Sequence, residues 1–334
     1  MPERVAVVTT SYPTSDGDFS GHFVQAEARE LAARGHVVTV ICGEGAPSGI
    51  CSGNAGRAPP SLRVVRLPDG GACGFPGVLA RLRERPRRAL GLFAWMLRAR
   101  RALRRLGPFD RVIAHWLLPS GAPIALTAPL AGARLEIVVH GSDARLLARL
   151  PPPVPHLVLA ALQRRRALLR CVSHDLVDVL ERASGAPLGA VRVDLPPIET
   201  PNVPARAAAR AELGLDPERR LMVVVARLVP SKRVHAALSA ARLVAPLDVV
   251  VVGDGPEARS LAQAFPEARF VGRVPRRTAL TWIAAADVLV SASADEGAPT
   301  AIREARALAV PVVARRAGDL ARWAEADPGL FVLP

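Results

Sequence analysis

The chain contains little lysine, little asparagine and few aromatic residues. Of its 44 basic residues only Lys232 is a lysine, and asparagine occurs only at Asn54 and Asn202. This bias is typical of a GC-rich genome that encodes arginine wherever a positive charge is needed, so a retained lysine points to a specific role. Aromatic residues make up 4% of the 334 residues. Together with the confinement of positive charge to one segment, this disfavours a nucleic-acid partner.

Cysteine is also scarce, and its four residues show no CxxC spacing. Cys42 and Cys171 lie in apolar, strand-like runs, which indicates buried, reduced thiols in a cytosolic protein rather than disulfides or zinc. The apolar run at the amino terminus is too short for a signal peptide. Residues 112–133 contain no Asp, Glu, Lys or Arg over 22 residues, long enough to span a bilayer. Their three prolines and two glycines instead predict a strand, a turn and a helix.

Short apolar runs alternate with helical patterns along the whole chain. Such runs, rich in β-branched residues and followed by helices, predict parallel sheets covered on both faces. The pattern restarts after a proline-rich segment, which predicts two doubly wound, Rossmann-like α/β domains, 1–198 and 199–334, facing a ligand cleft. The expected strands are 4–10, 36–42, 62–67, 111–116, 135–141 and 169–174, then 221–228, 247–255, 268–272, 287–293, 311–316 and 329–334.

The net charge of +14 is concentrated in residues 79–106, which hold ten arginines and one glutamate. From Leu92 onward an apolar face recurs at helical spacing, with most arginines elsewhere on the wheel. With Phe93 and Trp95, this segment predicts either a helix that contacts an anionic membrane surface or a packed helix with a solvated arginine face.

Lys232 follows the predicted strand that ends near Arg227. Pro230 and Ser231 turn the chain, and Ser231 is a good N-cap, so Lys232 and Arg233 are expected in the first helical turn. Cations are disfavoured there by about 0.3–1 kcal/mol each. A bound anion, such as a diphosphate, reverses that preference. The alternative is two solvated basic side chains.

Two carboxylates eight residues apart follow a later strand. Glu296 is expected on a tight turn shaped by Gly297 and Pro299. Thr300 is expected to cap the next helix, whose first turns hold Glu304. A carboxylate accepts two hydrogen bonds side by side, which suits the vicinal hydroxyls of a sugar or ribose. The alternatives are an exposed loop acid and favourable pairing with the helix dipole.

These segments resemble the retaining glycosyltransferases of family 4, which have the GT-B fold. The resemblance lies in an E-x7-E motif at Glu296 and Glu304 and an R-x4-K motif at Arg227 and Lys232. It is strengthened by "AHWLLPSG", "VVHGSD" and "VVVGDGPEARSL" in the family's order, and it covers residues 4 to 334. It implies an acceptor side in the first domain and a nucleotide-sugar donor side in the second.

The resemblance implies a role for each motif residue. Arg227 and Lys232 would hold the donor diphosphate, Glu304 the ribose and Glu296 the donor sugar. His140 would reach that sugar from the first domain. The remaining implied donor contacts are Gly17, Gly21, Arg273, Val274, Pro299, Thr300 and Ala301.

Three patterns compete with this interpretation. "DGD" at 16–18 imitates a metal-binding motif, but the family implies no metal, and none is expected. "GDGPEA" at 253–258 imitates a dinucleotide fingerprint, but the next strand ends without the required acid, so a turn with a helix beginning at Pro256 is expected. His115 and His174 end separate strands and are expected to be satisfied structural groups.

The expected protein is therefore a metal-independent, hexosyltransferase-type retaining glycosyltransferase. It needs no cofactor besides a UDP- or GDP-linked sugar, and its acceptor is a glycan, a lipid-linked glycan or a small molecule. Its expected location is the cytoplasm or the inner face of the cell membrane. A GT-B sugar-nucleotide epimerase and a non-catalytic nucleotide-sugar binder remain alternatives. The chain ends at "GLFVLP", where family members normally continue with helices. The expected consequence is weaker closure between the domains, exposed apolar surface or a binder that turns over poorly.

Overall fold

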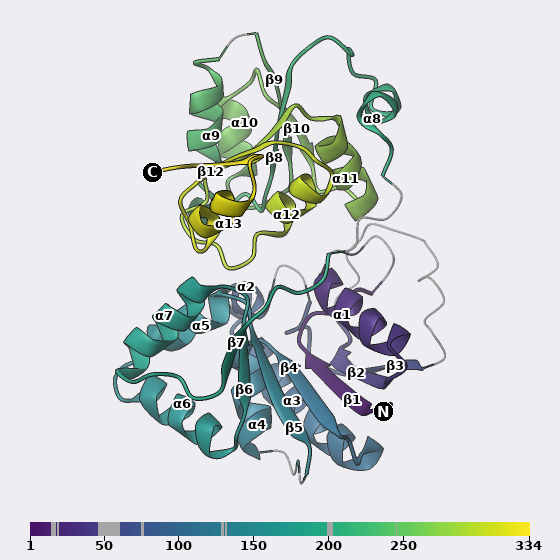
Figure 1. The fold of residues 1–334 in the computed structure, drawn as a ribbon, viewed down its shortest axis with the longest axis vertical. Helices are drawn as coiled ribbons and strands as arrows, with labels where there is room; N and C mark the ends of the chain where they lie inside the picture. Colours follow the sequence, from purple (N-terminus) through teal and green to yellow (C-terminus); the bar gives the residue numbers. More distant parts are fainter. Residues whose placement is uncertain are drawn as a thin grey trace. The chain divides into compact units, whose positions relative to one another are not determined.

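The chain folds into two compact units, Met1–Pro197 and Ile198–Pro334. The computed structural model describes residues 1–14, 18, 20–45, 61–74, 77–127, 130, 132–198, 203–244 and 246–334. Each unit contains one parallel sheet with helices on both faces (Figure 1). The predicted class, two doubly wound α/β domains, is confirmed. The boundary predicted after residue 198 lies one residue beyond this division.

Unit 1 has a seven-stranded sheet in the order β3-β2-β1-β4-β5-β6-β7. Its strands are β1 Arg4–Thr9, β2 Val37–Gly43, β3 Leu62–Leu67, β4 Arg111–His115, β5 Arg134–Val139, β6 Leu168–Cys171 and β7 Val191–Val193. Its helices are α1 His22–Ala33, α2 Val78–Glu84, α3 Arg88–Leu106, α4 Ala122–Thr127, α5 Ser142–Ala148, α6 Val154–Arg164 and α7 His174–Ser184, with a helical turn, η1, at Leu117–Gly121. Six of the strands were predicted from the sequence, and β7 was missed.

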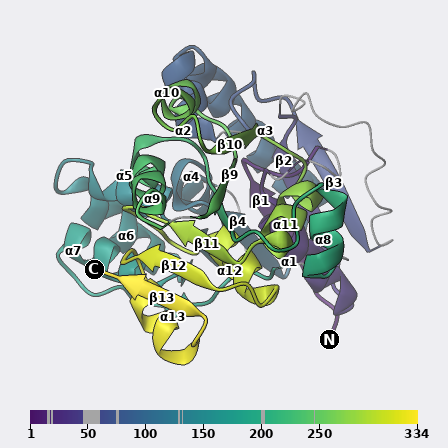
Figure 2. The ribbon, with the colours of Figure 1, turned by 90° about the horizontal axis from the view of Figure 1, so that it is seen from above.

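Unit 2 has a six-stranded sheet in the order β10-β9-β8-β11-β12-β13. Its strands are β8 Leu221–Val225, β9 Asp248–Val252, β10 Arg269–Gly272, β11 Val288–Ser291, β12 Val312–Arg315 and β13 Leu330–Leu333. Its helices are α8 Arg206–Glu212, α9 Val234–Ala241, α10 Ala258–Ala264, α11 Arg276–Ala285, α12 Thr300–Ala307 and α13 Leu320–Ala326, with a 3-10 turn, η2, at Pro230–Lys232. In Figure 2, β11, β12 and β13 follow one another to the sheet edge where the chain ends.

Burial of continuous apolar runs explains the central strands. The side chains of Val5, Val7 and Val8 in β1 have no exposed surface, on either face of the sheet. In unit 2 one core cluster includes Trp282 and the other Phe265. Both faces of each sheet are covered, which is why the strands are apolar throughout rather than alternating.

Each sheet has one point where the strand order reverses. In unit 1 it lies between β1 and β4, and in unit 2 between β8 and β11. Connections after the two strands at such a point leave in opposite directions, and ligands of open α/β sheets bind there, at the carboxyl ends of the strands. These two places are where functional side chains are to be sought.

The arginine-rich segment forms α2 and α3, separated by Arg85–Arg87. Its predicted apolar face packs inward, because Leu92 and Leu103 are buried. Trp95 is fully buried too, so its expected role in membrane contact was wrong, whereas Phe93 is exposed. Residues 112–133 contain β4, η1 and α4, as predicted. Within the described ranges no helix has the length and apolar character needed to cross a membrane.

Cys42 and Cys171 are buried, as the sequence predicted. Cys42, Cys73 and Cys171 are all buried free thiols, whereas Cys51 lies outside the described residues. Burial raises the pKa of the Cys42 thiol to about 11, so this thiol stays protonated and behaves as a small apolar group.

Candidate functional site

Lys232 ends a 3-10 turn, which corrects the predicted helix start. The turn closes with the Lys232 amide donating to the Val229 carbonyl at 2.9 Å, and Arg233 then adopts a positive φ of 47°. Helix α9 begins only at Val234. The N-cap of this helix is Arg233 rather than Ser231, and the Ser231 carbonyl accepts the Ala294 amide at 2.8 Å. That bond joins the connection after β8 to the connection after β11.

Glu296 lies opposite Lys232 at the reversal point of the unit 2 sheet. Lys232 Nζ donates to Glu296 Oε1 at 2.6 Å. The two side chains are only 19% and 10% exposed, so the pair is largely removed from water. The structure thus brings together one residue from each predicted motif, following the two central strands. Their carboxylate and ammonium can engage hydroxyl and phosphate groups of one ligand.

Glu304 lies in α12, on the same side of the sheet. Burial raises its pKa, and the guanidinium of Arg276 opposes that shift. Arg276 donates to Glu304 Oε1 from Nη2 at 2.8 Å and from Nε at 3.1 Å. Arg303 is also close, and burial lowers its pKa to about 10. Arg276 was not predicted from the sequence, although it begins α11 two residues after the implied donor contact Val274.

The other predicted donor contacts occupy the same edge of the sheet. Arg227 is exposed two residues beyond β8, and Arg273 and Val274 directly follow β10. Pro299 rather than Thr300 is the N-cap of α12, so the predicted capping role of Thr300 was wrong. Thr300 and Ala301 form the first turn of that helix.

A glycine turn supports the loop that carries Arg227. Gly253 has φ of 140°, and a Cβ at this position would overlap the Ala226 carbonyl oxygen. Gly255 approaches Leu228 in the same way, and the Leu228 amide donates to the Asp254 carbonyl at 3.0 Å. The expected turn is therefore present, although α10 begins at Ala258 rather than at Pro256.

In unit 1, His140 follows β5 and lies against His115, which ends β4. His115 Nδ1 and His140 Nε2 are 3.0 Å apart. Phe23 and Trp116 both pack against the His140 ring, each with a centroid distance of 4.9 Å. Burial lowers the pKa of His115 to about 3 and that of His140 well below its usual value. Both rings are therefore neutral at pH 7. His115 was expected to be an independent structural group, whereas it contacts a predicted site residue.

Asp143 fixes the connections after β4 and β5 to each other. Its carboxylate accepts the amides of Leu117 at 2.6 Å and Gly141 at 2.8 Å, and also that of His140. Burial raises its pKa, and these backbone bonds oppose the rise. Asp143 therefore determines where His140 leaves its strand.

Gly21 caps α1 with φ of 71°, where a Cβ would overlap the Ser11 carbonyl oxygen. Its close approach is thus to the chain itself. Asp18 accepts the amides of Thr14 at 3.0 Å and Ser20 at 2.8 Å, which orders this connection. Gly17, the other predicted contact here, lies outside the described residues.

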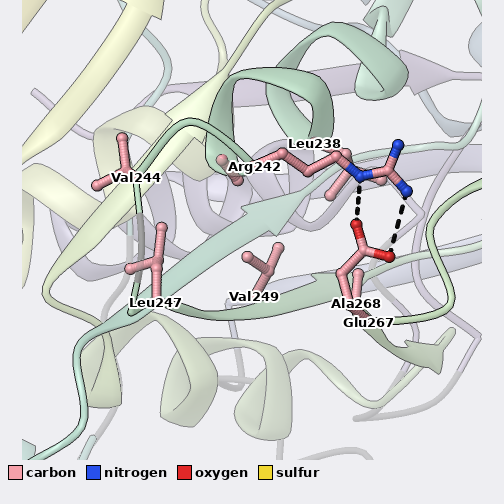
Figure 3. A pocket seen from close by; sticks show the side chains of 8 residues that line it. Leu238, Arg242, Val244, Leu247, Val249, Glu267 and Ala268 are labelled. Atoms are coloured by element: carbon pink, nitrogen blue, oxygen red, sulfur yellow. Dashed lines mark hydrogen bonds and ion pairs between the residues drawn. The ribbon is translucent and has the colours of Figure 1, made fainter.

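A pocket of about 360 Å³ in unit 2 lies elsewhere (Figure 3). Leu247 and Val249, at the amino end of β9, line it. Arg242 Nε donates to Glu267 Oε1 at 2.6 Å across it, as the dashed lines show. The predicted donor residues follow the carboxyl ends of the strands, so this pocket is on the opposite edge of the sheet. No group of three or more metal-ligating side chains occurs in the described part of the chain.

Comparison with known families identifies this arrangement. A model described as "Glycosyl transferase 4-like domain" matches residues 20–197, and one described as "Glycosyl transferases group 1" matches residues 219–334. The chain belongs to the family 4 glycosyltransferases. The predicted resemblance and the GT-B fold are confirmed.

Relatives agree with this assignment over nearly the whole chain. This glycosyltransferase is 28% identical, over 355 residues, to a Bacillus subtilis (strain 168) protein. The assigned name of that protein is teichuronic acid biosynthesis glycosyltransferase TuaC. The match covers 99% of this chain and 85% of TuaC. A sucrose-phosphate synthase from Thermosynechococcus elongatus superposes with a TM-score of 0.76 at 18% identity, covering 99% of this chain and 86% of that one. Anabaena HepE superposes at 0.65 with 16% identity, covering 99% and 85%.

Proposed function

We propose that this glycosyltransferase moves a sugar from a nucleoside-diphosphate donor to an acceptor with retention of the anomeric configuration. The observation that carries the proposal is the 2.6 Å pair of Lys232 and Glu296 at the reversal point of the unit 2 sheet. The Anabaena HepE structure holds UDP, which supports a nucleotide partner, UDP- or GDP-linked. The name of TuaC refers to teichuronic acid biosynthesis, which supports a glycan or lipid-linked acceptor over a small molecule.

In the proposed reaction, negative charge develops on the leaving diphosphate, next to Lys232 and Arg227. The bond from the sugar C1 to the phosphate oxygen breaks, and C1 bonds to the acceptor oxygen, whose proton passes to the departing phosphate. Negative charge grows on the diphosphate, and Lys232 and Arg227 stabilise it. Removing one such preorganised partner typically raises a barrier by about 2.7–4 kcal/mol. Glu296 holds donor sugar hydroxyls, and Glu304 holds the ribose. No metal or cofactor takes part in this proposal.

Nucleoside diphosphate release from UDP- and GDP-sugars tests the reaction, with glycan and lipid-linked acceptors and with EDTA present. We expect acceptor-dependent release, a product that NMR shows to have the donor's anomeric configuration, and no effect of EDTA. Loss of nucleotide-sugar without an acceptor would reveal an epimerase. Tight binding without turnover on any acceptor would reveal a non-catalytic binder, and either result would overturn the proposal.

We also propose that the enzyme works at an anionic membrane surface, through the outer side of α3 rather than through its packed side. Leu90, Phe93 and Leu97 are 77%, 59% and 39% exposed and lie along one side of the helix. Arg101 and Arg104 continue the same line and have no ion-pair partner among the described residues. Apolar side chains that enter the interface, beside arginines that meet lipid phosphates, are typical of helices lying on membranes.

A basic pocket adjoins this line at the corner between α2 and α3. It has a volume of about 680 Å³ and is lined by Gly70, Glu84, Arg85, Pro86, Arg87, Arg88 and Gly91. Its only acid pairs with Arg88, whose Nη1 donates to Glu84 Oε2 at 2.7 Å. The remaining positive charge suits a lipid phosphate. The exposed apolar line favours lipid over nucleic acid, which offers no apolar layer for these side chains.

Sedimentation with phosphatidylglycerol-containing vesicles tests this surface, with phosphatidylcholine vesicles for comparison. Binding should weaken with salt and fall at least tenfold in Leu90→Ser/Phe93→Ser and in Arg101→Glu/Arg104→Glu. The matched controls Leu243→Ser and Arg259→Glu/Arg322→Glu change exposed positions of unit 2 and should bind normally. Equal binding of all variants, or absence of binding by the unaltered protein, would refute the proposal.

A further inference from the structure

A chain of buried polar groups reaches from the interior of unit 1 to His140. Glu27 in α1 is buried, and its Oε2 lies 3.6 Å from His115 Nε2. Neither atom has a hydrogen-bond partner among the described residues. The other nitrogen of His115, Nδ1, lies 3.0 Å from His140 Nε2. Glu27, His115 and His140 therefore form a line in which each group faces the next.

Arg170 pairs with the Glu27 carboxylate and holds it in place. Arg170 Nη1 donates to Glu27 Oε1 at 2.6 Å and to Glu136 Oε2 at 3.2 Å, and Asp194 pairs with the same guanidinium. A guanidinium partner compensates a buried carboxylate for its lost hydration. Glu27 Oε2 therefore presents negative charge to His115.

The charge of Glu27 decides which nitrogens of the two neutral rings carry hydrogen. A neutral imidazole donates from one nitrogen and accepts at the other. If His115 donated from Nδ1, its bare Nε2 would face a carboxylate, and two electron-rich atoms would repel. If His115 carries its hydrogen on Nε2, that hydrogen faces Glu27, and Nδ1 accepts from His140 Nε2. Only the second arrangement places opposite partial charges together at both contacts, between His115 and Glu27 and between His115 and His140.

We infer that Glu27 and His115 are positioning residues that hold His140 in the tautomer with hydrogen on Nε2 and a bare Nδ1. His140 then meets a ligand as a hydrogen-bond acceptor at Nδ1, which suits a donating sugar hydroxyl and disfavours a phosphate or carboxylate oxygen. Phe23 and Trp116, which also contact each other, pack against the ring and restrict its orientation. In catalytic triads, a buried acid likewise orients a histidine by bonding to the ring nitrogen that does not take part in the reaction. The expected effect on turnover rests on the proposed function, whereas the assignment of the tautomer does not depend on it.

Imidazole nitrogen NMR of the full chain at pH 7.5 tests the inference without any substrate. For the unaltered protein we expect His140 with a protonated Nε2 and an unprotonated Nδ1, assigned by loss of its signals in His140→Gln. In Glu27→Gln, His140 should lose its preference for the tautomer with hydrogen on Nε2. The glutamine amide can donate to His115 Nε2, which reverses the direction of the hydrogen bonds between the three side chains. Glu136→Gln is the matched control, since it also removes an Arg170 partner without facing His115, and should leave the tautomer unchanged.

Steady-state kinetics add the second readout. Glu27→Gln should lower kcat at least tenfold with less than a threefold change in the donor KM, whereas Glu136→Gln should stay within threefold in both. A His140 that carries hydrogen on Nδ1 in the unaltered protein overturns the inference. So does a Glu27→Gln spectrum identical to that of Glu136→Gln. The predicted tautomer in a protein that turns over no donor would leave the inference standing and refute the proposed function instead.

Discussion

Lys232 Nζ lies 2.6 Å from Glu296 Oε1, and the two residues follow the adjacent central strands β8 and β11. Each side chain thus neutralises the other when no ligand is bound. Under the proposed function, a diphosphate would compete with Glu296 for the ammonium, and a sugar would compete with Lys232 for the carboxylate. A nucleotide-sugar would offer both at once and so replace the pair with two complementary contacts.

Replacing Glu296 with Gln should separate nucleotide binding from turnover. Without the carboxylate, Lys232 is free to meet a diphosphate, so affinity for the nucleoside diphosphate should stay equal or rise by a few-fold. Transfer should fall by about a hundredfold, because the donor sugar loses a charged partner. Asp295→Asn, a change at the exposed neighbouring acid, should alter neither. Equal losses of binding and transfer in Glu296→Gln would contradict this division of roles.

Arg276→Met should destabilise the protein through Glu304. The substitution leaves a buried carboxylate with less compensation for its lost hydration, which should lower the free energy of unfolding by about 1–3 kcal/mol at pH 7.5. Urea denaturation measures this change. Arg277→Met, at an exposed arginine whose ion pair with Glu212 is 3.6 Å long, should change it by less than about 0.5 kcal/mol. Indistinguishable variants would show that Glu304 does not depend on Arg276.

Gly253→Ala should disrupt the loop that carries Arg227. A Cβ there would overlap the Ala226 carbonyl oxygen at a φ of 140°, so we expect a loss of about 3 kcal/mol or more and weakened nucleotide binding. Gly214→Ala provides the control, because its φ is also positive, at 64°, but no atom lies within 4 Å of the added carbon. That change should cost about 1 kcal/mol. Thermal unfolding of both variants measures the difference.

The buried histidines predict a loss of stability in mild acid. Burial lowers the pKa of His115 from its ordinary 6.5 to about 3. Between these values the unfolded chain binds a proton that the folded chain does not, so stability falls as pH falls below 6.5. His140, Glu27 and Arg170 are the charged or titratable groups that face it. The loss expected from His115 alone between pH 7.5 and pH 5 is about 2 kcal/mol.

Urea denaturation at these two pH values, with His115→Asn beside the unaltered protein, checks this prediction. The variant should show a smaller pH dependence, while His156→Gln at an exposed histidine should keep the original one. An unchanged slope in His115→Asn would contradict the assignment of the effect to His115.

The sequence predicted the central strands because they are long, apolar and buried on both sides. It missed β7, whose three residues are mostly exposed and form no apolar run. It placed Lys232 in a helix, since it could not show that the Ser231 carbonyl bonds the Ala294 amide from a distant connection. The contact of His115 with His140 depends on the pairing of β4 with β5, and the partnership of Arg276 with Glu304 on the packing of α11 against α12. Both are tertiary relationships that no local pattern encodes.

Calorimetric titration with UDP, GDP and ADP, beside Lys232→Ala, tests whether Lys232 binds a diphosphate. We expect saturable binding of one nucleotide and at least tenfold weaker binding by the variant, because the ammonium meets the diphosphate. Arg259→Ala, at an exposed arginine of α10, should bind like the unaltered protein. Absence of binding to all three nucleotides, or equal affinity in Lys232→Ala, would contradict a diphosphate site at Lys232.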